Sequence, residues 1–156
     1  MQIDKKLLLK CIALPLLVGL VSSLLTGNSM QMFGMLNKPP FSPPGWLFPV
    51  VWTILYVLMG ISSYLVLTSG KDQQSVEKSI LLYRYQLIVN FLWSTFFFSF
   101  EWYLFSFLWL ILLWVLIFLM IRSFWEVSRL AALLQIPYLL WVTFAGYLNL
   151  GIWLLN

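Results

Sequence analysis

Five continuous apolar runs, each long enough to cross a bilayer as a helix, constrain this chain more than any other feature. They are Leu7 to Thr26, Trp46 to Thr68, Ile80 to Phe100, Trp102 to Ile121 and Leu130 to Leu155. At about 1.5 Å per residue, roughly 20 helical residues cross a hydrocarbon core of about 30 Å. A membrane β-strand needs about half that length and alternates in polarity. The sequence therefore predicts an all-α integral membrane protein, a five-transmembrane-helix bundle forming a single domain over residues 1–156.

The composition agrees with lipid as the solvent of this chain. Hydrophobic residues make up 62% of the sequence and charged residues only 9%, which is too little polar surface to cover a water-soluble core. Aromatic residues account for 19%, more than the belts at the two membrane interfaces need. We therefore expect some aromatic rings to line the interior of the bundle.

Missing residue types exclude several kinds of chemistry. The chain has no histidine and a single cysteine, Cys11. Disulfide frameworks, zinc clusters, His-ligated haem and Ser-His or Cys-His nucleophiles are thus excluded, and we expect no metal site and no cofactor. The ionisable residues lie at the ends of the runs, which argues against an ion channel or pump. The basic residues are scattered rather than clustered, which argues against nucleic acid as a partner.

The distribution of basic residues predicts the topology. If the N-terminus is cytoplasmic, only Lys38 of the nine basic residues lies outside, so eight lie inside. The inner residues are Lys5, Lys6, Lys10, Lys71, Lys78, Arg84, Arg122 and Arg129. The C-terminus is then outside. The first run has no A-x-A cleavage site, so we interpret it as a retained helix rather than a signal peptide.

The first connection, Gly27 to Gly45, is the only long one. The other connections are Gly70 to Ser79, a turn at Glu101, and Ser123 to Arg129. The first connection contains Pro39, Pro40, Pro43 and Pro44, which favour a stiff extended path. It is either a rigid linker or a lid over the outer mouth of the bundle. Ser42 before Pro43 is typical of an N-cap, which would start the second helix there.

Three runs contain a proline: Pro15, Pro49 and Pro137. A proline inside a helix frees the carbonyl four residues earlier and bends the helix. The bends serve packing alone, or they open a central cavity.

The third run has a partly polar face. Tyr83, Gln86, Asn90, Ser94 and Phe97 follow one another at three- or four-residue spacing and so share one side of a helix. An unpartnered amide in hydrocarbon costs several kcal/mol, so Gln86 and Asn90 must point into the bundle. They either hydrogen-bond neighbouring helices or contact a polar ligand.

Two further rows combine aromatic and small residues. Pro49, Trp52, Tyr56 and Gly60 align on the second helix, and Tyr138, Trp141, Ala145 and Asn149 align on the fifth. Such rows often belong to a core, but the small residues leave room for a flat hydrophobic ligand between the rings. Gly19 and Ser23 form a small-xxx-small pair suited to close helix packing, in the bundle or in a dimer.

These segments resemble the translocator protein / tryptophan-rich sensory protein family, TspO/MBR, also called the peripheral benzodiazepine receptor family. The resemblance includes Gly19 and the segments L-N-K-P-P-F-S-P-P-G-W, residues 36–46, and P-V-V-W-T-I-L-Y-V-L-M-G, residues 49–60. It continues in Y-Q-L-I-V-N-F-L-W-S-T-F-F-F, residues 85–98, and in A-A-L-L-Q-I-P-Y-L-L-W-V-T-F-A-G-Y-L-N, residues 131–149. It covers the chain almost end to end.

The resemblance implies a five-helix bundle, usually a homodimer, whose pocket beneath the first loop binds porphyrins and isoquinoline or benzodiazepine drugs. Together with the inward rows, it gives the candidate ligand-binding residues. They are Pro43, Pro44, Phe48, Pro49, Trp52, Tyr56, Gln86, Asn90, Ser94, Phe97, Tyr138, Trp141, Ala145 and Asn149.

Three functions are compatible with this resemblance. The first is a membrane receptor or sensor for protoporphyrin-like tetrapyrroles, with a regulatory role in tetrapyrrole metabolism or stress. The second is a cofactor-free enzyme that degrades protoporphyrin IX with light and oxygen, in which the matching residues Trp52 and Trp141 would be catalytic. The third is a porphyrin transporter, against which the lack of inverted repeats argues.

Two features bear on partners and location. Animal members of the family carry a cholesterol-recognition pattern with Tyr and a basic residue at the end of the fifth helix. Residues 148–156 contain neither, which argues against sterol binding. Nothing before Leu7 resembles a mitochondrial transit peptide, so we expect a bacterial cytoplasmic membrane.

Overall fold

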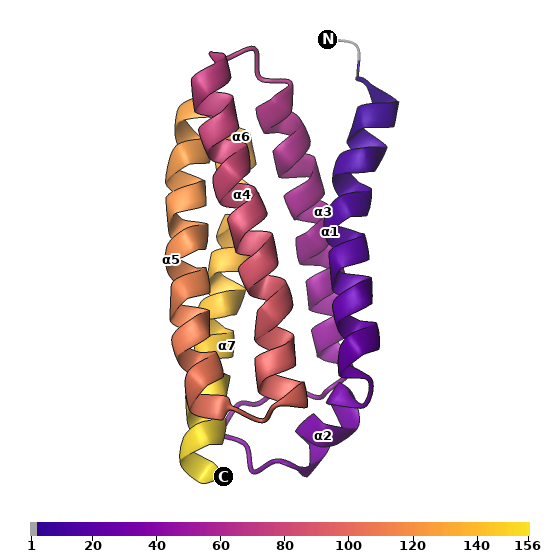
Figure 1. Cartoon of the computed structure of the whole chain (residues 1–156), viewed down its shortest axis with the longest axis vertical. Coiled ribbons are helices and arrows are strands. Elements are labelled where there is room, and N and C mark those ends of the chain that lie inside the picture. Colours follow the sequence, from indigo (N-terminus) through magenta and orange to yellow (C-terminus); the bar gives the residue numbers. More distant parts are fainter. Residues whose placement is uncertain (1–2) are drawn as a thin grey trace.

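The computed structural model describes residues 3–156, and within them it contains helices and no strand. The helices are α1 (Lys5–Thr26), α2 (Ser29–Met35), α3 (Leu47–Leu67), α4 (Gln73–Ser94), the π-helix η1 (Thr95–Ser99), α5 (Tyr103–Val127), α6 (Arg129–Leu133) and α7 (Ile136–Leu155). The long helices α1, α3, α4 with η1, α5, and α6 with α7 form five rods. They run side by side, with α2 lying across one end (Figure 1). The predicted all-α five-helix bundle is confirmed.

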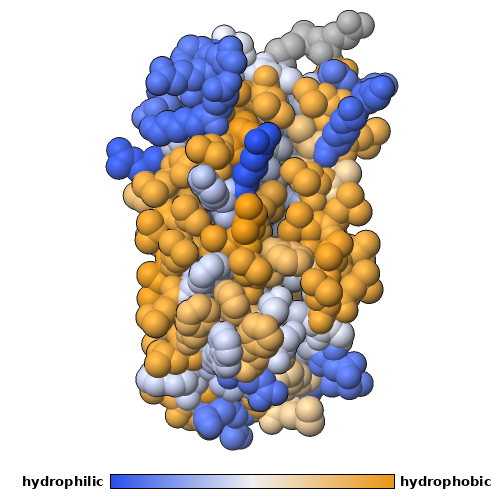
Figure 2. Space-filling view, in the orientation of Figure 1, coloured by the Kyte–Doolittle hydropathy of each residue, from blue (hydrophilic) through white to orange (hydrophobic). Residues whose placement is uncertain are grey.

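The surface of the bundle suits a bilayer. Within residues 3–156, four stretches are long and apolar enough to span it: α1, α3, α5 and the continuous Arg129–Leu155. The fifth rod, α4, begins with a polar segment, and its apolar part continues through η1. Hydrophilic residues gather mainly at the two ends of the molecule and an apolar band lies between them (Figure 2).

The rods form a closed ring around a shared core. α1 packs on α3 and α4, α3 packs on α6, and α5 lies between α4 and α7. The core side chains from these helices include Met59, Leu113, Ile117, Met120 and Phe124, all with no exposed surface. The start of α1 and the C-terminus lie at opposite ends, and the C-terminus shares its end with α2 (Figure 1).

Local capping fixes where several helices begin. The Asp4 side chain accepts a hydrogen bond from the Leu7 N–H at 3.0 Å and caps α1. Asp72 accepts from the Ser75 N–H at 2.9 Å and caps α4, a contact that also lowers the pKa of Asp72. Ser128 caps α6 by accepting from the Ala131 N–H.

Several helices continue beyond the apolar runs from which the spans are predicted. α1 begins at Lys5 rather than Leu7, and α4 begins at Gln73 rather than Ile80. α5 continues from Ile121 to Val127, so the predicted connection from Ser123 to Arg129 is reduced to Ser128. An apolar run measures the thickness of the hydrocarbon core, whereas charged residues at its ends can stay helical in the interface.

Of the three prolines in the predicted spans, only Pro15 lies in the interior of a helix, α1. Pro49 is the third residue of α3 and Pro137 the second of α7. The backbone N–H groups of a helix's first turn have no carbonyl partner within the helix, so a proline there costs no hydrogen bond. Neither therefore bends the middle of a helix. The fifth predicted span instead breaks at Leu134 and Gln135 into α6 and α7.

The predicted start of the second long helix at Ser42 and Pro43 was wrong. α3 begins at Leu47, and the Ser42 hydroxyl donates to the Pro39 carbonyl at 2.7 Å instead of capping a helix. The reason lies in the sequence, because a residue that precedes proline avoids the helical region and Pro43 precedes Pro44. Residues 36–44 consequently follow an irregular path without a helix, as the prolines predict.

Candidate functional site

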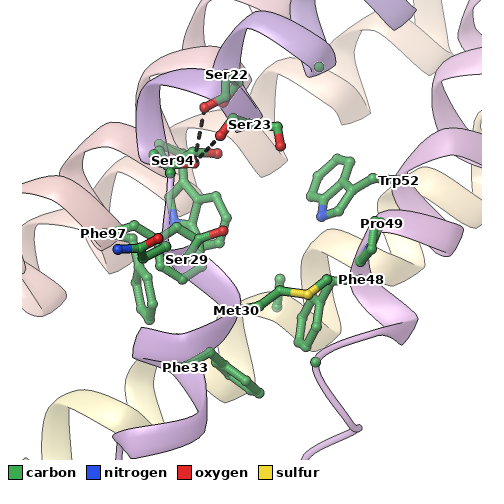
Figure 3. Close-up of a pocket in the computed structure, with 18 of the residues that line it drawn as sticks. Ser22, Ser23, Ser29, Met30, Phe33, Phe48, Pro49, Trp52, Ser94 and Phe97 are labelled. Carbon is green, nitrogen blue, oxygen red and sulfur yellow. Dashed lines mark hydrogen bonds between the residues drawn. The ribbon is translucent and has the colours of Figure 1, made fainter.

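A cavity of about 790 Å³ opens at the end of the bundle that α2 crosses. It is bounded by the second half of α1, the first half of α3, the end of α4 with η1, and the second half of α7. α2 closes it with Met30 and Phe33, which Figure 3 shows below the cavity. The volume is in the range of pockets that bind drug-sized or larger ligands.

One wall of the cavity is aromatic. Trp52 stacks on Tyr56 with ring centroids 5.6 Å apart and meets Tyr138 edge to face at 6.1 Å. Phe48 meets Phe33 of α2 edge to face at 4.9 Å, which ties the closing helix to α3. The two inward aromatic rows therefore meet inside the bundle, as their spacing predicts.

The opposite wall is formed by α1, α4 and the start of α2 and is rich in hydroxyl groups. Ser22, Ser23, Ser29 and Ser94 lie on this side, across from Trp52 and Pro49 (Figure 3). Among the described residues that line the cavity, none is charged. The site therefore has hydroxyl groups on one side, with Phe97 beside them, the Trp52 and Tyr56 rings on the other, and no formal charge among the described residues.

Gly19 is needed for this shape. A Cβ atom at position 19 would overlap the ring of Tyr56. The close approach of α1 to the Tyr56 ring thus depends on glycine, as the small-xxx-small pair suggested for bundle packing.

The structure brings eight of the candidate residues to the cavity and places six outside it. Those lining it are Phe48, Pro49, Trp52, Tyr56, Ser94, Phe97, Ala145 and Asn149. Those outside its lining are Pro43, Pro44, Gln86, Asn90, Tyr138 and Trp141. Pro43 and Pro44 lie in the α2–α3 connection.

The side chains of Gln86 and Asn90 are hydrogen-bonded to a residue of α7. The Asn90 amide donates to the Tyr138 hydroxyl at 2.9 Å, and that hydroxyl donates to Gln86 Oε1 at 2.7 Å. All three side chains are buried. Of the two alternatives for Gln86 and Asn90, hydrogen bonding to a neighbouring helix therefore applies. These bonds join α4 to α7.

Trp141 does not line the cavity but packs behind a residue that does. Its ring meets Phe48, a lining residue, edge to face at 5.7 Å. Its buried indole N–H has no hydrogen-bond partner among residues 3–156. Trp52 and Trp141 thus occupy unequal positions, since only Trp52 lines the cavity.

Asn149 lines the cavity and also links three elements. Its Oδ1 accepts hydrogen bonds from Trp93 Nε1 and Ser106 Oγ, both at 3.1 Å. Its Nδ2 donates to the Tyr103 carbonyl at 2.8 Å. The side chain joins α7 to α4 and to the start of α5.

The connection between α2 and α3 is fastened to α7. Asn156 accepts from the Asn37 N–H at 3.1 Å and donates to the Asn37 carbonyl at 2.8 Å. The Tyr147 hydroxyl donates to the Pro40 carbonyl at 2.8 Å. Pro39 lies so close to Gly151 that a Cβ there would be 2.5 Å from Pro39 Cγ. We call residues 36–46 the strap.

Residues 11–154 match the model of the TspO/MBR family, which is almost the whole chain. The chain belongs to the TspO/MBR family. It is a multi-pass membrane protein whose surroundings are lipid, as its spans predict.

Relatives of this TspO/MBR protein come from distant organisms. It is 42% identical to "Tryptophan-rich protein TspO" of Chlorobaculum tepidum over 147 residues, 94% of this chain and 93% of that relative. It is 39% identical to "Protein CrtK" of Rhodobacter capsulatus over 124 residues, 80% of this chain and 78% of the relative. It is 32% identical to the bovine (Bos taurus) "Translocator protein" over 142 residues, 90% of this chain and 84% of the relative.

Sequence reasoning missed the contribution of α1 and α2 to the pocket of this TspO/MBR protein. Lining residues from these helices include Leu16, Ser22, Thr26, Met30 and Phe33. In α1 the apolar residues run all around the helix, so no face stands out. For α2, the spacing of Met30 and Phe33 on one side of a seven-residue helix is the only available signal.

Proposed function

We propose that this protein is a membrane receptor or sensor that binds a porphyrin such as protoporphyrin IX in the cavity between α1, α3, α4 and α7. The observation that carries the proposal is the cavity of about 790 Å³ with the Trp52–Tyr56 stack on one wall. A flat aromatic macrocycle can stack on such rings and bury most of its surface. The regulatory role in tetrapyrrole metabolism or stress is part of the same proposal.

The chemistry of the lining favours recognition by shape. The chain has no histidine, so it cannot supply an imidazole ligand to a porphyrin metal. Binding of a metalloporphyrin should therefore show no imidazole ligation.

The binding proposal predicts a moderate effect of replacing Trp52. Trp52→Phe keeps an aromatic ring but removes part of the stacking surface, so porphyrin affinity should fall by no more than about tenfold, or ~1.4 kcal/mol. Quenching of protein fluorescence during titration with protoporphyrin IX in detergent measures it. Trp125→Phe is the matched control, because Trp125 is exposed near the end of α5 and outside the cavity. An unaltered affinity in Trp52→Phe, or no binding by the parent protein, would contradict the proposal.

The enzymatic alternative rests on the position of Trp52 in the wall and of Trp141 behind Phe48. If these indoles exchange electrons with an excited porphyrin, light should destroy bound porphyrin in the parent protein. The Trp52→Phe, Trp141→Phe double variant should then bind porphyrin but lose the photochemistry, since phenylalanine is harder to oxidise. Absorbance of protoporphyrin IX in light and in darkness distinguishes the two functions. Degradation that persists in the double variant would eliminate the enzyme, and its absence in the parent would leave the sensor.

We further propose a bacterial cytoplasmic membrane with the N-terminus inside. Lys5 and Lys6 lie at the start of α1 and Lys71 in the α3–α4 connection, at the end away from α2, whereas Lys38 lies beside α2. Because most basic residues would lie on the inner side, the C-terminus should be outside. A phosphatase fused there should be active. A fluorescent protein that is exported unfolded to that side should be dark. The reverse pattern would overturn the orientation.

A homodimer through α1 is the proposed assembly. α1 presents a row of exposed apolar side chains, among them Leu17 at 57% and Leu24 at 72% exposure. Lipid or a second copy can cover such a row within a membrane, and the family resemblance favours the second copy.

A further inference from the structure

Several threonine hydroxyl groups in the spans are satisfied by local hydrogen bonds. Thr53, Thr68 and Thr143 each donate to the carbonyl four residues earlier, at 2.7 to 2.8 Å. Such local bonds satisfy a hydroxyl group where water is absent. They leave no donor for anything else.

The serines of the wall have no such bonds. None of the described residues forms a hydrogen bond with the hydroxyls of Ser22, Ser23, Ser29 or Ser94. Ser22 is the most informative, because it is only 7% exposed and lines the cavity. The Ser22 hydroxyl is not one of the fully enclosed partnerless atoms of residues 3–156, so it opens onto the cavity, where a ligand or water can satisfy it.

Interhelical packing does not account for these groups. The serines come from α1, α2 and α4, yet no hydrogen bond joins them across the helices, although α1 packs on α4. The wall faces the Trp52 side across the cavity rather than lying in a closed helix contact (Figure 3). Its donors are therefore free for whatever occupies the cavity.

Lys38, the basic residue that follows α2, is not available for the same task. Lys38 Nζ donates to the carbonyls of Phe33 at 2.9 Å and of Gly34 and Leu36 at 3.3 Å. It also lies over the outer surface of the Phe33 ring, 5.1 Å from its centroid, and does not line the cavity. A negatively polarised group in the cavity can find hydroxyl donors but no lysine or arginine among the lining residues.

We infer that Ser22 and Ser94, with Ser23 and Ser29 beside them, form a subsite that hydrogen-bonds the carboxyl oxygens of the ligand while its ring system stacks on Trp52. The inference rests on the proposed porphyrin function and deepens it, since it sets the orientation of the macrocycle. The propionic acid edge lies against α1 and α4, and the edge without carboxyl groups lies toward α3.

The test compares two porphyrins that differ in their carboxyl groups. Protoporphyrin IX carries two, and etioporphyrin carries alkyl groups only. In the Ser22→Ala, Ser94→Ala double variant, loss of two hydrogen bonds should weaken protoporphyrin IX binding by roughly tenfold. Etioporphyrin binding should stay unchanged, which also shows that the pocket is still folded. Ser94→Thr in place of Ser94→Ala keeps a hydroxyl and should restore part of the affinity.

Ser99→Ala is the matched control, because Ser99 lies in η1, is exposed and does not line the cavity. An equal loss for both porphyrins, or no loss for protoporphyrin IX, would overturn the subsite and leave the porphyrin function standing. If the parent protein binds neither porphyrin, the proposed function fails and the subsite fails with it.

Discussion

Replacing Gly60 by alanine should lower the free energy of unfolding of the bundle by about 3 kcal/mol, the upper range for overpacking a tight interior. Gly60 faces α1, and a Cβ there would overlap Ile12 Cα and lie 2.7 Å from the Cys11 carbonyl oxygen. These are backbone atoms, which cannot rotate away as a side chain can. α1 must therefore separate from α3. Thermal unfolding in detergent measures the loss.

Gly146→Ala is the matched control for this substitution. Its Cβ would meet only side-chain atoms, Leu110 Cδ2 at 3.8 Å and Phe107 Cε2 at 4.0 Å, which is ordinary contact. Alanine stabilises a helix relative to glycine by about 1 kcal/mol, so Gly146→Ala should leave stability unchanged or raise it. Equal behaviour of the two variants would show that α1 does not pack on α3 as described.

Replacing Asn149 by leucine should destabilise the protein by about 2 kcal/mol, although leucine is similar in size and more apolar. The change removes the acceptor of the buried Trp93 N–H, and a buried donor left without a partner costs about 1–3 kcal/mol. It also removes the bond from Asn149 to the Tyr103 carbonyl. Unfolding followed by tryptophan fluorescence reports both the stability and the altered environment of Trp93.

The corresponding control is Ser106→Ala. It removes the Ser106 hydroxyl, whose proton is shared between Asn149 Oδ1 and the Tyr103 carbonyl, but leaves the bonds of Asn149 to Trp93 and Tyr103 in place. Its effect should be at most about 1 kcal/mol, the net value of one hydrogen bond. A larger effect from Ser106→Ala than from Asn149→Leu would mean that the network is centred on the serine.

Helical spacing alone predicted which residues point inward. Trp52, Tyr56 and Ala145 were placed correctly on the inner faces because periodicity decides which side of a helix a residue occupies. Periodicity does not decide what an inward polar group binds. Asn90 pairs with Tyr138 and Ser94 has no partner, although both lie on one face of α4. That difference depends on which helix lies opposite.

The closing elements of the cavity could not be predicted in the same way. The seven residues of α2 are too few for a reliable helical pattern, and their position depends on contacts far along the chain. Pro43 and Pro44 were expected to bind ligand, but they lie in the strap and outside the lining of the cavity. The proline motif thus determines the stiffness of the connection, whereas contacts with α7 determine where the connection lies.

The strap gives the last residues of the chain an influence over entry to the cavity. Asn156 pairs with Asn37 through both its amide oxygen and its amide nitrogen, and α2 ends two residues before that asparagine. A tag or reporter joined directly after Asn156 would crowd this pair and loosen the cover of the pocket. Ligand exchange rates measured on such a fusion would then describe the fusion rather than the protein, so labels belong at the opposite end of the bundle.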